Sequence, residues 1–243
     1  MPSLQGRAGD DLLDQCQHRI RQSLKSRFEY HHMAISRSNA FLRKHDSREI
    51  PLYVIFVDIV GSTKLSAELK PGLLSKLITI YSQEMAYVIE HYGGYVLKYA
   101  GDAVLGYFPP NKKENNDAAN IVNCARSVMQ VVKDGMNPVL IEESLPSITI
   151  KTTADYGNNS IVKYGSDRRR AHIDIISFAM NVTAKMQNIT KPNHIAIGCE
   201  FHSRLNPDMQ AKFTKVSHSH AEWNYHAFGS NKPYEVFSDT IRP

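Results

Sequence analysis

Apolar residues near the start of the chain recur at three- and four-residue steps, which is the spacing of one helix face. They are Leu12, Leu13, Cys16, Ile20, Leu24 and Phe28. We expect a helix over residues 9 to about 44, with basic side chains on its opposite face, followed by a linker over His45–Ile50. A helix this exposed needs a binding partner. It packs against its own domain or forms a dimer, or, alternatively, it binds a membrane or nucleic acid. The chain then divides into an N-terminal helical extension, residues 1–48, and a main domain, residues 49–243.

The main domain begins with a near-continuous apolar run, Tyr53–Val60, typical of a strand buried on both faces. A second helical period over Leu73–Ile89 ends at a pair of glycines, as helices often do. Two apolar runs, Tyr95–Tyr99 and Val104–Phe108, flank Ala100-Gly101-Asp102. This pattern indicates a β-hairpin with glycine in its turn.

The second half of the chain continues this mixture of strands and helices. Asn115-Asn116-Asp117 can cap a helix along Ala118–Met129. Ile148–Asp155 alternates like a half-exposed strand, and we pair it with Ile161–Tyr164 across a turn at Gly157-Asn158-Asn159. The remaining predicted elements are a helix over Ile175–Ile189, a strand over His194–Ile197, a short helix over Glu200–Leu205 and a strand over Tyr234–Phe237. A hairpin in mid-domain excludes simple alternating βαβ winding. We therefore predict an α+β fold with a ferredoxin-like, palm-type central antiparallel sheet and flanking helices.

Composition narrows the class of protein. The 243 residues are 42% hydrophobic and 22% charged, as in globular proteins, and 29 basic against 24 acidic side chains leave a net charge of +5. That charge suits an anionic ligand but falls short of a nucleic-acid-binding surface. Cys16, Cys124 and Cys199 form no CxxC pair, which indicates a reducing compartment. We see no membrane span and no signal peptide, so we expect a soluble, cytoplasmic protein.

Two aspartates stand where apolar strands run out into glycine, Asp58 shortly before Gly61 and Asp102 directly after Gly101. A carboxylate that ends a buried strand is costly unless something pairs with it. If the hairpin pairs beside Tyr53–Val60, both carboxylates reach one edge of the sheet, where repulsion raises one pKa unless cations keep both ionised. Two Mg²⁺ ions about 3.5–4 Å apart would meet that need. The alternative is that Asp58 caps a turn and Asp102 belongs to an ordinary Gly-Asp hairpin turn.

Three stretches carry a more specific signal than either aspartate alone. They are FVDIVGST over Phe56–Thr63, LKYAGDAV over Leu97–Val104, and DIISFAMNVTAKM over Asp174–Met186. In this order they resemble the catalytic domain of class III nucleotidyl cyclases, most closely the small soluble archaeal and bacterial members. The resemblance covers roughly residues 51–240. It implies a domain that works as a homodimer, with each active site formed between two chains.

The resemblance also assigns roles on one side of that shared site. Asp58, Asp102 and Ile59 would hold two ions, Mg²⁺ or Mn²⁺. The backbone of Ile59, Val60, Gly61, Ser62 and Thr63 would hold the triphosphate, whose phosphates suit the free N–H groups of a turn that opens a helix. The ribose 3′-hydroxyl would attack the α-phosphorus, and pyrophosphate would leave.

The second chain would supply Lys98 and Asp174 for the base, and Asn181 with Lys185 for the transition state. Lysine only donates and aspartate only accepts hydrogen bonds, which matches the N1 acceptor and 6-amino donor of adenine. Guanine presents the reverse pattern, for which a glutamate is expected in place of Lys98. We therefore favour ATP and an adenylate cyclase. Cytosine shares the edge of adenine, so CTP stays open, and cyclic UMP or cyclic GMP are further alternatives. Without the resemblance, Lys98 is an ordinary solvated lysine and Asp174 a helix cap.

Some positions depart from the family pattern. Lys185 stands where arginine is usual, and a flexible point charge in place of a planar fork predicts slower turnover. Ser177 replaces the usual glycine and would tighten the pocket. Lys232 is only a vague counterpart of a late phosphate-binding lysine. We interpret Arg168–Arg170 as a solvated loop rather than a triphosphate clamp.

Other functions find little support. The histidines show no metal-binding spacing, so His218 and His220 are interpreted as surface residues rather than zinc ligands. Nothing resembles a Ser-His-Asp arrangement or a phosphate-binding P-loop. A catalytically silent, nucleotide-binding regulatory domain is the alternative from another class, and the presence of both Asp58 and Asp102 argues against it. A palm-type polymerase would need a longer chain and a basic groove.

Overall fold

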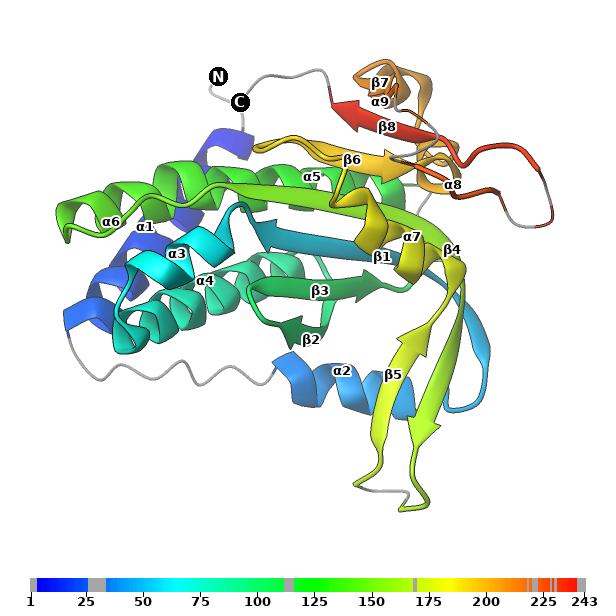
Figure 1. The fold of residues 1–243 in the computed structure, drawn as a ribbon, viewed down its shortest axis with the longest axis horizontal. Helices are drawn as coiled ribbons and strands as arrows, with labels where there is room; N and C mark the ends of the chain where they lie inside the picture. The colour runs from blue at the N-terminus through cyan, green and yellow to red at the C-terminus, as the bar shows by residue number, and fades with distance from the viewer. Residues whose placement is uncertain are drawn as a thin grey trace.

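This computed structural model describes residues 4–25, 34–111, 116–167, 170–217, 219, 223–227, 229 and 231–239. A mixed β-sheet forms the centre of the fold. Its strands are β1 (Glu49–Ile59), β2 (Tyr95–Ala100), β3 (Ala103–Phe108), β4 (Ile150–Tyr164), β5 (His172–Ile176), β6 (Ile195–Gly198), β7 (Phe213–Lys215) and β8 (Val236–Asp239). The strand order is β2-β3-β1-β4-β6-β8-β7, and β5 pairs with β4 (Figure 1). Within the described residues, the parallel pairing is β4 with β6 and the others are antiparallel. The predicted α+β class is confirmed.

Helices cover both sides of this sheet. They are α1 (Leu4–Lys25), α2 (Ala34–Arg43), α3 (Ser62–Glu68), α4 (Pro71–His91), α5 (Asp117–Gln130), the π-helix η1 (Val131–Met136), α6 (Asn137–Glu142), α7 (Phe178–Met186), α8 (Cys199–His202) and α9 (Pro207–Gln210). α4, α5 and η1 lie on one side, which we call the α4 face. α2 and α7 lie on the other, which we call the α7 face.

β1 shows why the sheet is central. Its side chains alternate between two separate cores, because successive strand residues point to opposite faces. Tyr53, Ile55 and Val57 pack on the α4 face, whereas Val54 and Phe56 pack on the α7 face. All five are buried, so the predicted strand with two covered faces is confirmed.

The N-terminal extension forms two helices instead of the one predicted over 9–44, and residues 26–33 lie outside the described part. α1 packs against α4, η1 and α6, with Cys16 and Ile20 fully buried. Arg19 makes two hydrogen bonds of 2.9 and 2.6 Å to the buried carboxylate of Glu84 in α4. α2 packs on β2 and β5. The partner that this amphipathic segment needed is therefore the body of its own chain.

One predicted hairpin is wrong. Gly157-Asn158-Asn159 is not a turn, because β4 continues through it and pairs with β1 from Glu49↔Ser160 to Ile59↔Ile150. Turn-forming residue types are tolerated here because the long ladder satisfies the backbone, and the buried Asn159 donates to the Gly157 carbonyl. The antiparallel partner of β4 at this end is β5, which begins at His172.

Two predicted boundaries also move. The helix expected from Ile175 begins at Phe178, because the Ser177 hydroxyl caps it by accepting from the Met180 N–H at 2.8 Å. Ile175 and Ile176 belong to β5. One third of the expected linker at 45–50 is already strand, since β1 begins at Glu49. The helices η1, α6 and α9 and the strands β5 and β7 were not predicted.

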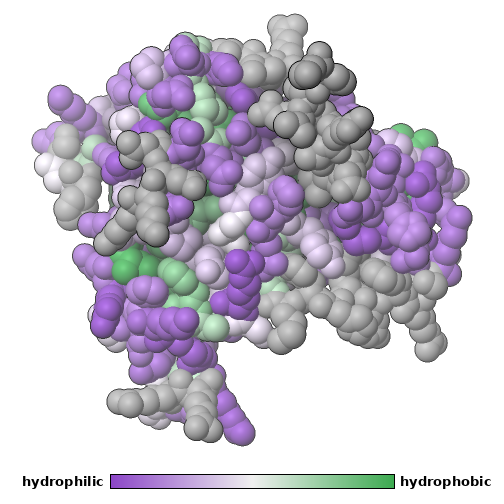
Figure 2. Space-filling model, turned by 180° about the vertical axis from the view of Figure 1, so that it is seen from behind, coloured by the Kyte–Doolittle hydropathy of each residue, from purple (hydrophilic) through white to green (hydrophobic). Residues whose placement is uncertain are grey.

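The outer surface is largely polar. Figure 2 shows the side opposite to that of Figure 1, where hydrophilic residues dominate and hydrophobic ones appear in small, separate patches. None of the helices in the described part of the chain combines the length and apolarity needed to cross a bilayer.

Candidate active site

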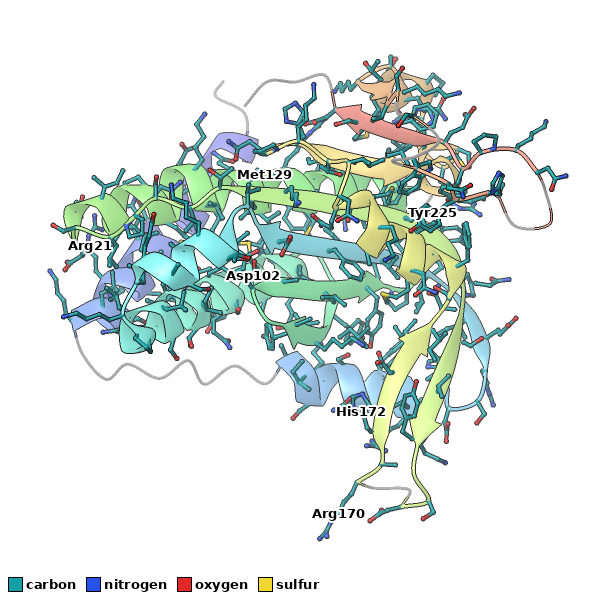
Figure 3. The ribbon with its side chains drawn as sticks, viewed as in Figure 1. Arg21, Asp102, Met129, Arg170, His172 and Tyr225 are labelled. Carbon is teal, nitrogen blue, oxygen red and sulfur yellow. The ribbon has the colours of Figure 1, made fainter. Side chains whose placement is uncertain are left out.

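Asp58 and Asp102 come together at one end of the central hairpin. Asp58 lies at the end of β1 and Asp102 in the turn between β2 and β3, and the pairing Val57↔Val104 brings these two ends side by side. Burial, followed by the negative charge of Asp102, raises the pKa of Asp58 to about 6, and Lys151 partly opposes this. Asp102 lies between α3 and the hairpin in Figure 3. The predicted meeting of two carboxylates at one sheet edge is therefore observed in the geometry.

The turns next to both aspartates need glycine. Gly61 precedes α3 with φ of 74°, and Gly101 precedes Asp102 with φ of 66°, a left-handed conformation that other residues rarely adopt. The Val60 N–H donates to the Thr149 carbonyl at 2.8 Å, which fixes the chain just before Gly61. The N–H groups at the start of α3 have no earlier helical turn to bond to. They are consequently available to a ligand beside Asp58.

The residues at this end fit hard cations. Asp102 Oδ2 is buried without a hydrogen-bond partner among the described residues, next to a second carboxylate that is costly to ionise. No cluster of three or more Cys, His, Asp or Glu side chains could hold a metal in the described part of the chain. Mg²⁺, however, takes one or two carboxylates and fills its remaining positions with phosphate oxygens, carbonyls and water. Asp58, Asp102 and the backbone of Ile59 can supply the protein's share.

Lys98 and Asp174 form a second polar group, between β2 and β5. Lys98 Nζ donates to Asp174 Oδ2 at 2.5 Å, and Asp174 Oδ1 accepts from the Ile175 N–H at 2.8 Å. His172 Nε2 lies 3.8 Å from Asp174 Oδ2. The pair thus presents a donor and an acceptor side by side in one chain.

A β-bulge in β2 decides which way Lys98 points. Val96 pairs with Gly106 and Lys98 with Leu105, so Leu97 is an extra residue in the strand. Regular alternation from Leu97, which packs on the α7 face, would turn Lys98 toward α4. With the bulge, Lys98 faces the same side as Leu105, where β5 carries Asp174. No signal in the sequence pattern had indicated this bulge.

Asn181 and Lys185 lie one turn apart on α7, and both are exposed. Neither side chain hydrogen-bonds to another described residue. Ile176 and Phe178, next to them in the chain, are large hydrophobic residues with 46% and 37% exposure. The Ser177 hydroxyl caps the helix and donates to Asn159 Oδ1 at 2.7 Å, so this position supports α7, and its effect on a pocket stays a prediction.

The structure leaves several predicted residues outside these groups. No hydrogen bond or ion pair between described residues joins Asp58 or Asp102 to Lys98 or Asp174. Lys232 lies in the loop before β8, where its carbonyl accepts from the Ala227 N–H, and a phosphate contact stays a prediction. Arg170 is exposed at the tip of the β4–β5 hairpin (Figure 3). The other candidates that we named, Arg168, Arg169, His218 and His220, lie outside the described residues.

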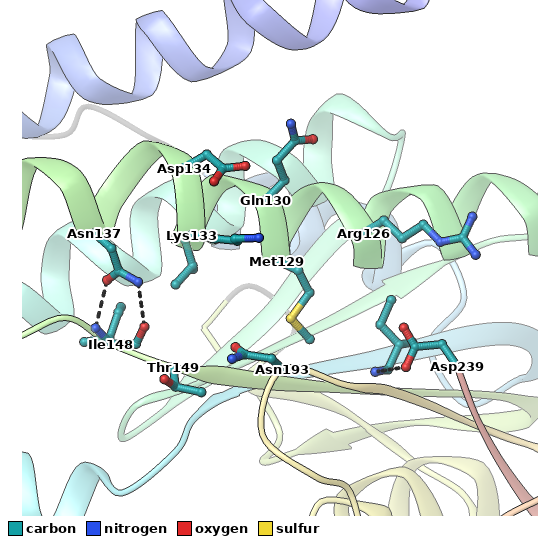
Figure 4. Close-up of a pocket in the computed structure, with 12 residues that line it drawn as sticks. Arg126, Met129, Gln130, Lys133, Asp134, Asn137, Ile148, Thr149, Asn193 and Asp239 are labelled. Atoms are coloured by element: carbon teal, nitrogen blue, oxygen red, sulfur yellow. Dashed lines mark hydrogen bonds between the residues drawn. The ribbon is translucent and has the colours of Figure 1, made fainter. Parts of the chain in front are cut away.

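Two residues near the aspartates were missed from the sequence. Lys151 stands directly opposite Asp58 in the β1–β4 ladder, which only the long register of β4 reveals. Tyr81 lies on the apolar face predicted for α4, where nothing distinguishes it from a core residue. A groove of about 460 Å³ lies elsewhere, between α5–η1–α6 and the starts of β4 and β6 (Figure 4). In it, the Asn137 side chain is already bonded to both backbone groups of Ile148.

The sheet is mainly antiparallel and has flanking helices. Two carboxylates lie at the end of its central hairpin, with a donor–acceptor pair nearby. Together these features define a domain of the nucleotide cyclase type. Residues 46–235 match the family described as "Adenylate and Guanylate cyclase catalytic domain". The chain belongs to this family, the class III nucleotidyl cyclases.

Known relatives agree with this assignment. A cytidylate cyclase from Escherichia coli is 22% identical over 82% of this chain and 48% of its own length. A cytidylate cyclase from Staphylococcus aureus is 28% identical over 67% of this chain and 38% of its own length. The chain spans about half the length or less of these relatives. The crystal structure of the adenylyl cyclase CyaB from P. aeruginosa superposes with a TM-score of 0.65 and 22% identity, over 81% of this chain and 96% of that one.

Proposed function

We propose that this protein is an adenylate cyclase that converts ATP into 3′,5′-cyclic AMP and pyrophosphate at a homodimer interface. The observation that carries the proposal is the meeting of Asp58 and Asp102, with a buried, unpartnered carboxylate oxygen, in a domain of the cyclase family. Such a pair is unfavourable by itself and becomes favourable when divalent cations bind.

Asp58, Asp102 and the backbone of Ile59 would hold two ions, Mg²⁺ or Mn²⁺. When bound, the ions would lower the pKa of the ribose 3′-hydroxyl and neutralise charge on the phosphates. The chain's own part is to bind and orient the substrate. The N–H groups from Gly61 to Thr63 bind the triphosphate, and Asn181 and the positively charged Lys185 stabilise the transition state. The 3′-oxygen then forms a bond to the α-phosphorus, while the bond between the α-phosphorus and the pyrophosphate oxygen breaks.

The Lys98–Asp174 pair supports adenine as the base. Lys98 can donate to N1 of adenine and Asp174 can accept from the 6-amino group, whereas guanine and uracil present the opposite order. Cytosine presents the same order as adenine. Because the two bacterial relatives described above are named cytidylate cyclases, CTP is the second candidate substrate.

The proposal of a homodimer is supported by side chains that make no hydrogen bond to a described residue within one chain. Asn181 and Lys185 are exposed without side-chain partners among the described residues, and the apolar Ile176 and Phe178, at the end of β5 and the start of α7, are exposed as well. In a two-fold dimer, the α7 surface of one chain would complete the site that begins at Asp58 of its partner.

The test is to incubate the purified protein with ATP, GTP, CTP and UTP separately, with Mn²⁺, and to identify the products by mass spectrometry. We expect cyclic AMP, and none from the Asp58→Asn variant. If cyclic CMP is the only product, the proposed substrate changes from ATP to CTP. Cyclic UMP or cyclic GMP alone would contradict the role of the Lys98–Asp174 pair. Absence of every cyclic nucleotide would refute the enzyme itself.

A further inference from the structure

Two buried oxygen atoms near the proposed cation site lack hydrogen-bond partners in the described part of the chain. One is the hydroxyl of Tyr81, a fully buried residue of α4, and the other is Oδ2 of Asp102. A buried polar group without a partner destabilises the fold, so each such atom calls for a physical explanation. Tyr81 offers a donor, and Asp102 has two carboxylate oxygens, so one can hold a cation while the other accepts a hydrogen bond.

Other buried tyrosines of this protein are satisfied. The Tyr107 hydroxyl donates to the Ser38 carbonyl at 3.2 Å, and the Tyr234 hydroxyl donates to Asp155 at 2.6 Å. Buried tyrosine hydroxyls usually find such partners. Tyr81 therefore differs from comparable tyrosines in the same molecule.

α4 packs on the hairpin that carries Asp102. It contacts both β2 and β3, Tyr81 shares the core on the α4 face with Val104 of β3, and Asp102 lies in the turn two residues before Val104. Burial raises the pKa of Tyr81, and the negative charges of Asp58 and Asp102 raise it further. The next turn of α4 carries Glu84, which holds Arg19 of α1 and fixes the helix in place.

We infer that the Tyr81 hydroxyl donates a hydrogen bond to the Asp102 carboxylate when that carboxylate holds a cation, and that Tyr81 is a positioning residue of the cation site. The inference rests on the proposed function. A carboxylate that binds a cation through one oxygen keeps the other oxygen free to accept, and a donor there fixes its orientation. In the cation-free protein the same hydroxyl makes no stabilising hydrogen bond to a described residue, so its contribution to stability depends on the bound ion.

The experiment compares Tyr81→Phe with Tyr107→Phe, a buried tyrosine that is bonded to Ser38. Urea unfolding in EDTA measures the cation-free fold, and electron paramagnetic resonance of free Mn²⁺ measures cation binding in the presence of ATP. For Tyr81→Phe we expect an unchanged or higher urea midpoint, with a Mn²⁺ dissociation constant raised roughly tenfold. For Tyr107→Phe we expect a lower midpoint and unchanged Mn²⁺ binding.

Unchanged Mn²⁺ affinity in Tyr81→Phe would overturn the inference. A lower urea midpoint in EDTA, or failure of this variant to fold, would overturn it too, because the hydroxyl would then serve the cation-free fold. Both results leave the proposed function intact if the unsubstituted protein binds Mn²⁺ and makes product. An unsubstituted protein that binds no Mn²⁺ would refute the proposed function and this inference with it.

Discussion

Lys98 donates a 2.5 Å hydrogen bond to Asp174, which is 76 residues later in the chain. The pair holds a donor and an acceptor in place before any base arrives. We expect Asp174→Ala to lower kcat/KM for the preferred nucleotide roughly 10- to 100-fold, the effect of losing a hydrogen bond to a charged group. Lys163→Met is the matched control, because it breaks another lysine–aspartate pair, to Asp46 at 2.9 Å. Equal losses in both variants would show a general effect on folding.

Asp58 should make the cation-free protein sensitive to pH. Because its pKa is raised to about 6, its contribution to stability is full below about pH 4 and is lost as the pH rises through about 6. Allowing for partial solvent screening, the loss is on the order of 1–2 kcal/mol. Urea unfolding in EDTA at pH 4.5 and pH 7.5 measures it. Asp58→Asn should remove this part of the pH dependence, and saturating Mn²⁺ should reverse it, since cations favour the ionised form. A Mn²⁺-independent profile would contradict the cation site.

Asp155 should contribute a second, cation-independent pH effect. It is fully buried in β4, and burial raises its pKa to about 7 despite the hydrogen bonds it accepts from the Tyr234 hydroxyl and the Tyr156 N–H. Its contribution to stability is therefore lost as the pH rises toward and through 7. Urea midpoints of Asp155→Asn should vary less between pH 5 and pH 8 than those of the unsubstituted protein, with or without Mn²⁺. Parallel profiles for the two proteins would show that Asp155 keeps an ordinary pKa.

Docking of α1 depends on a buried carboxylate. Glu84 is 1% exposed and receives both hydrogen bonds from Arg19, so Arg19→Met would remove the positive charge that pairs with a buried carboxylate. We expect a loss of about 3–5 kcal/mol in the free energy of unfolding. Adding Glu84→Gln should recover much of it. As a control, Arg21→Met removes an exposed pair with Glu142 and should cost less than about 1 kcal/mol. Similar losses for both arginine variants would contradict this account of the docking.

Lys185→Arg should increase turnover. Lys185 is exposed on α7 without a hydrogen bond to a described residue, so a longer, planar guanidinium meets no obstacle there. Arginine can grip a phosphate through two parallel hydrogen bonds, which lysine cannot do. Steady-state kinetics would show a higher kcat with little change in KM. An unchanged or lower kcat would refute this role.

The sequence predicted most of what depends on local pattern. The buried β1, the hairpin around Asp102 and the helix ending near Gly93 follow from periodicity and glycine placement. The family resemblance, confirmed over residues 46–235, named the residues of the candidate site, whose roles stay predictions. Prediction failed where long-range pairing outweighed local signals. Gly157 reads as a turn residue, yet it lies inside a strand because β1 pairs with β4 along its whole length.

The direction of Lys98 and the surroundings of Asp58 were also beyond the sequence. A bulge at Leu97 changes the strand's alternation without leaving a mark in residue type. Lys151 reaches Asp58 only through the register of two strands that are about ninety residues apart in the chain. Likewise, an unsatisfied hydroxyl such as that of Tyr81 cannot be distinguished from ordinary apolar burial until the helix is placed on the sheet.

The separation of Asp58 and Asp102 from Lys98 and Asp174 has a genetic consequence in the proposed dimer. A chain with Asp58→Asn should be inactive alone, and a chain with Lys98→Ala should be strongly impaired. Subunit exchange between them would assemble heterodimers in which one active site carries both defects and the other carries none. With random exchange, half of the dimers are mixed, so about a quarter of the unsubstituted activity should return. Two recessive alleles of this one gene would then complement each other.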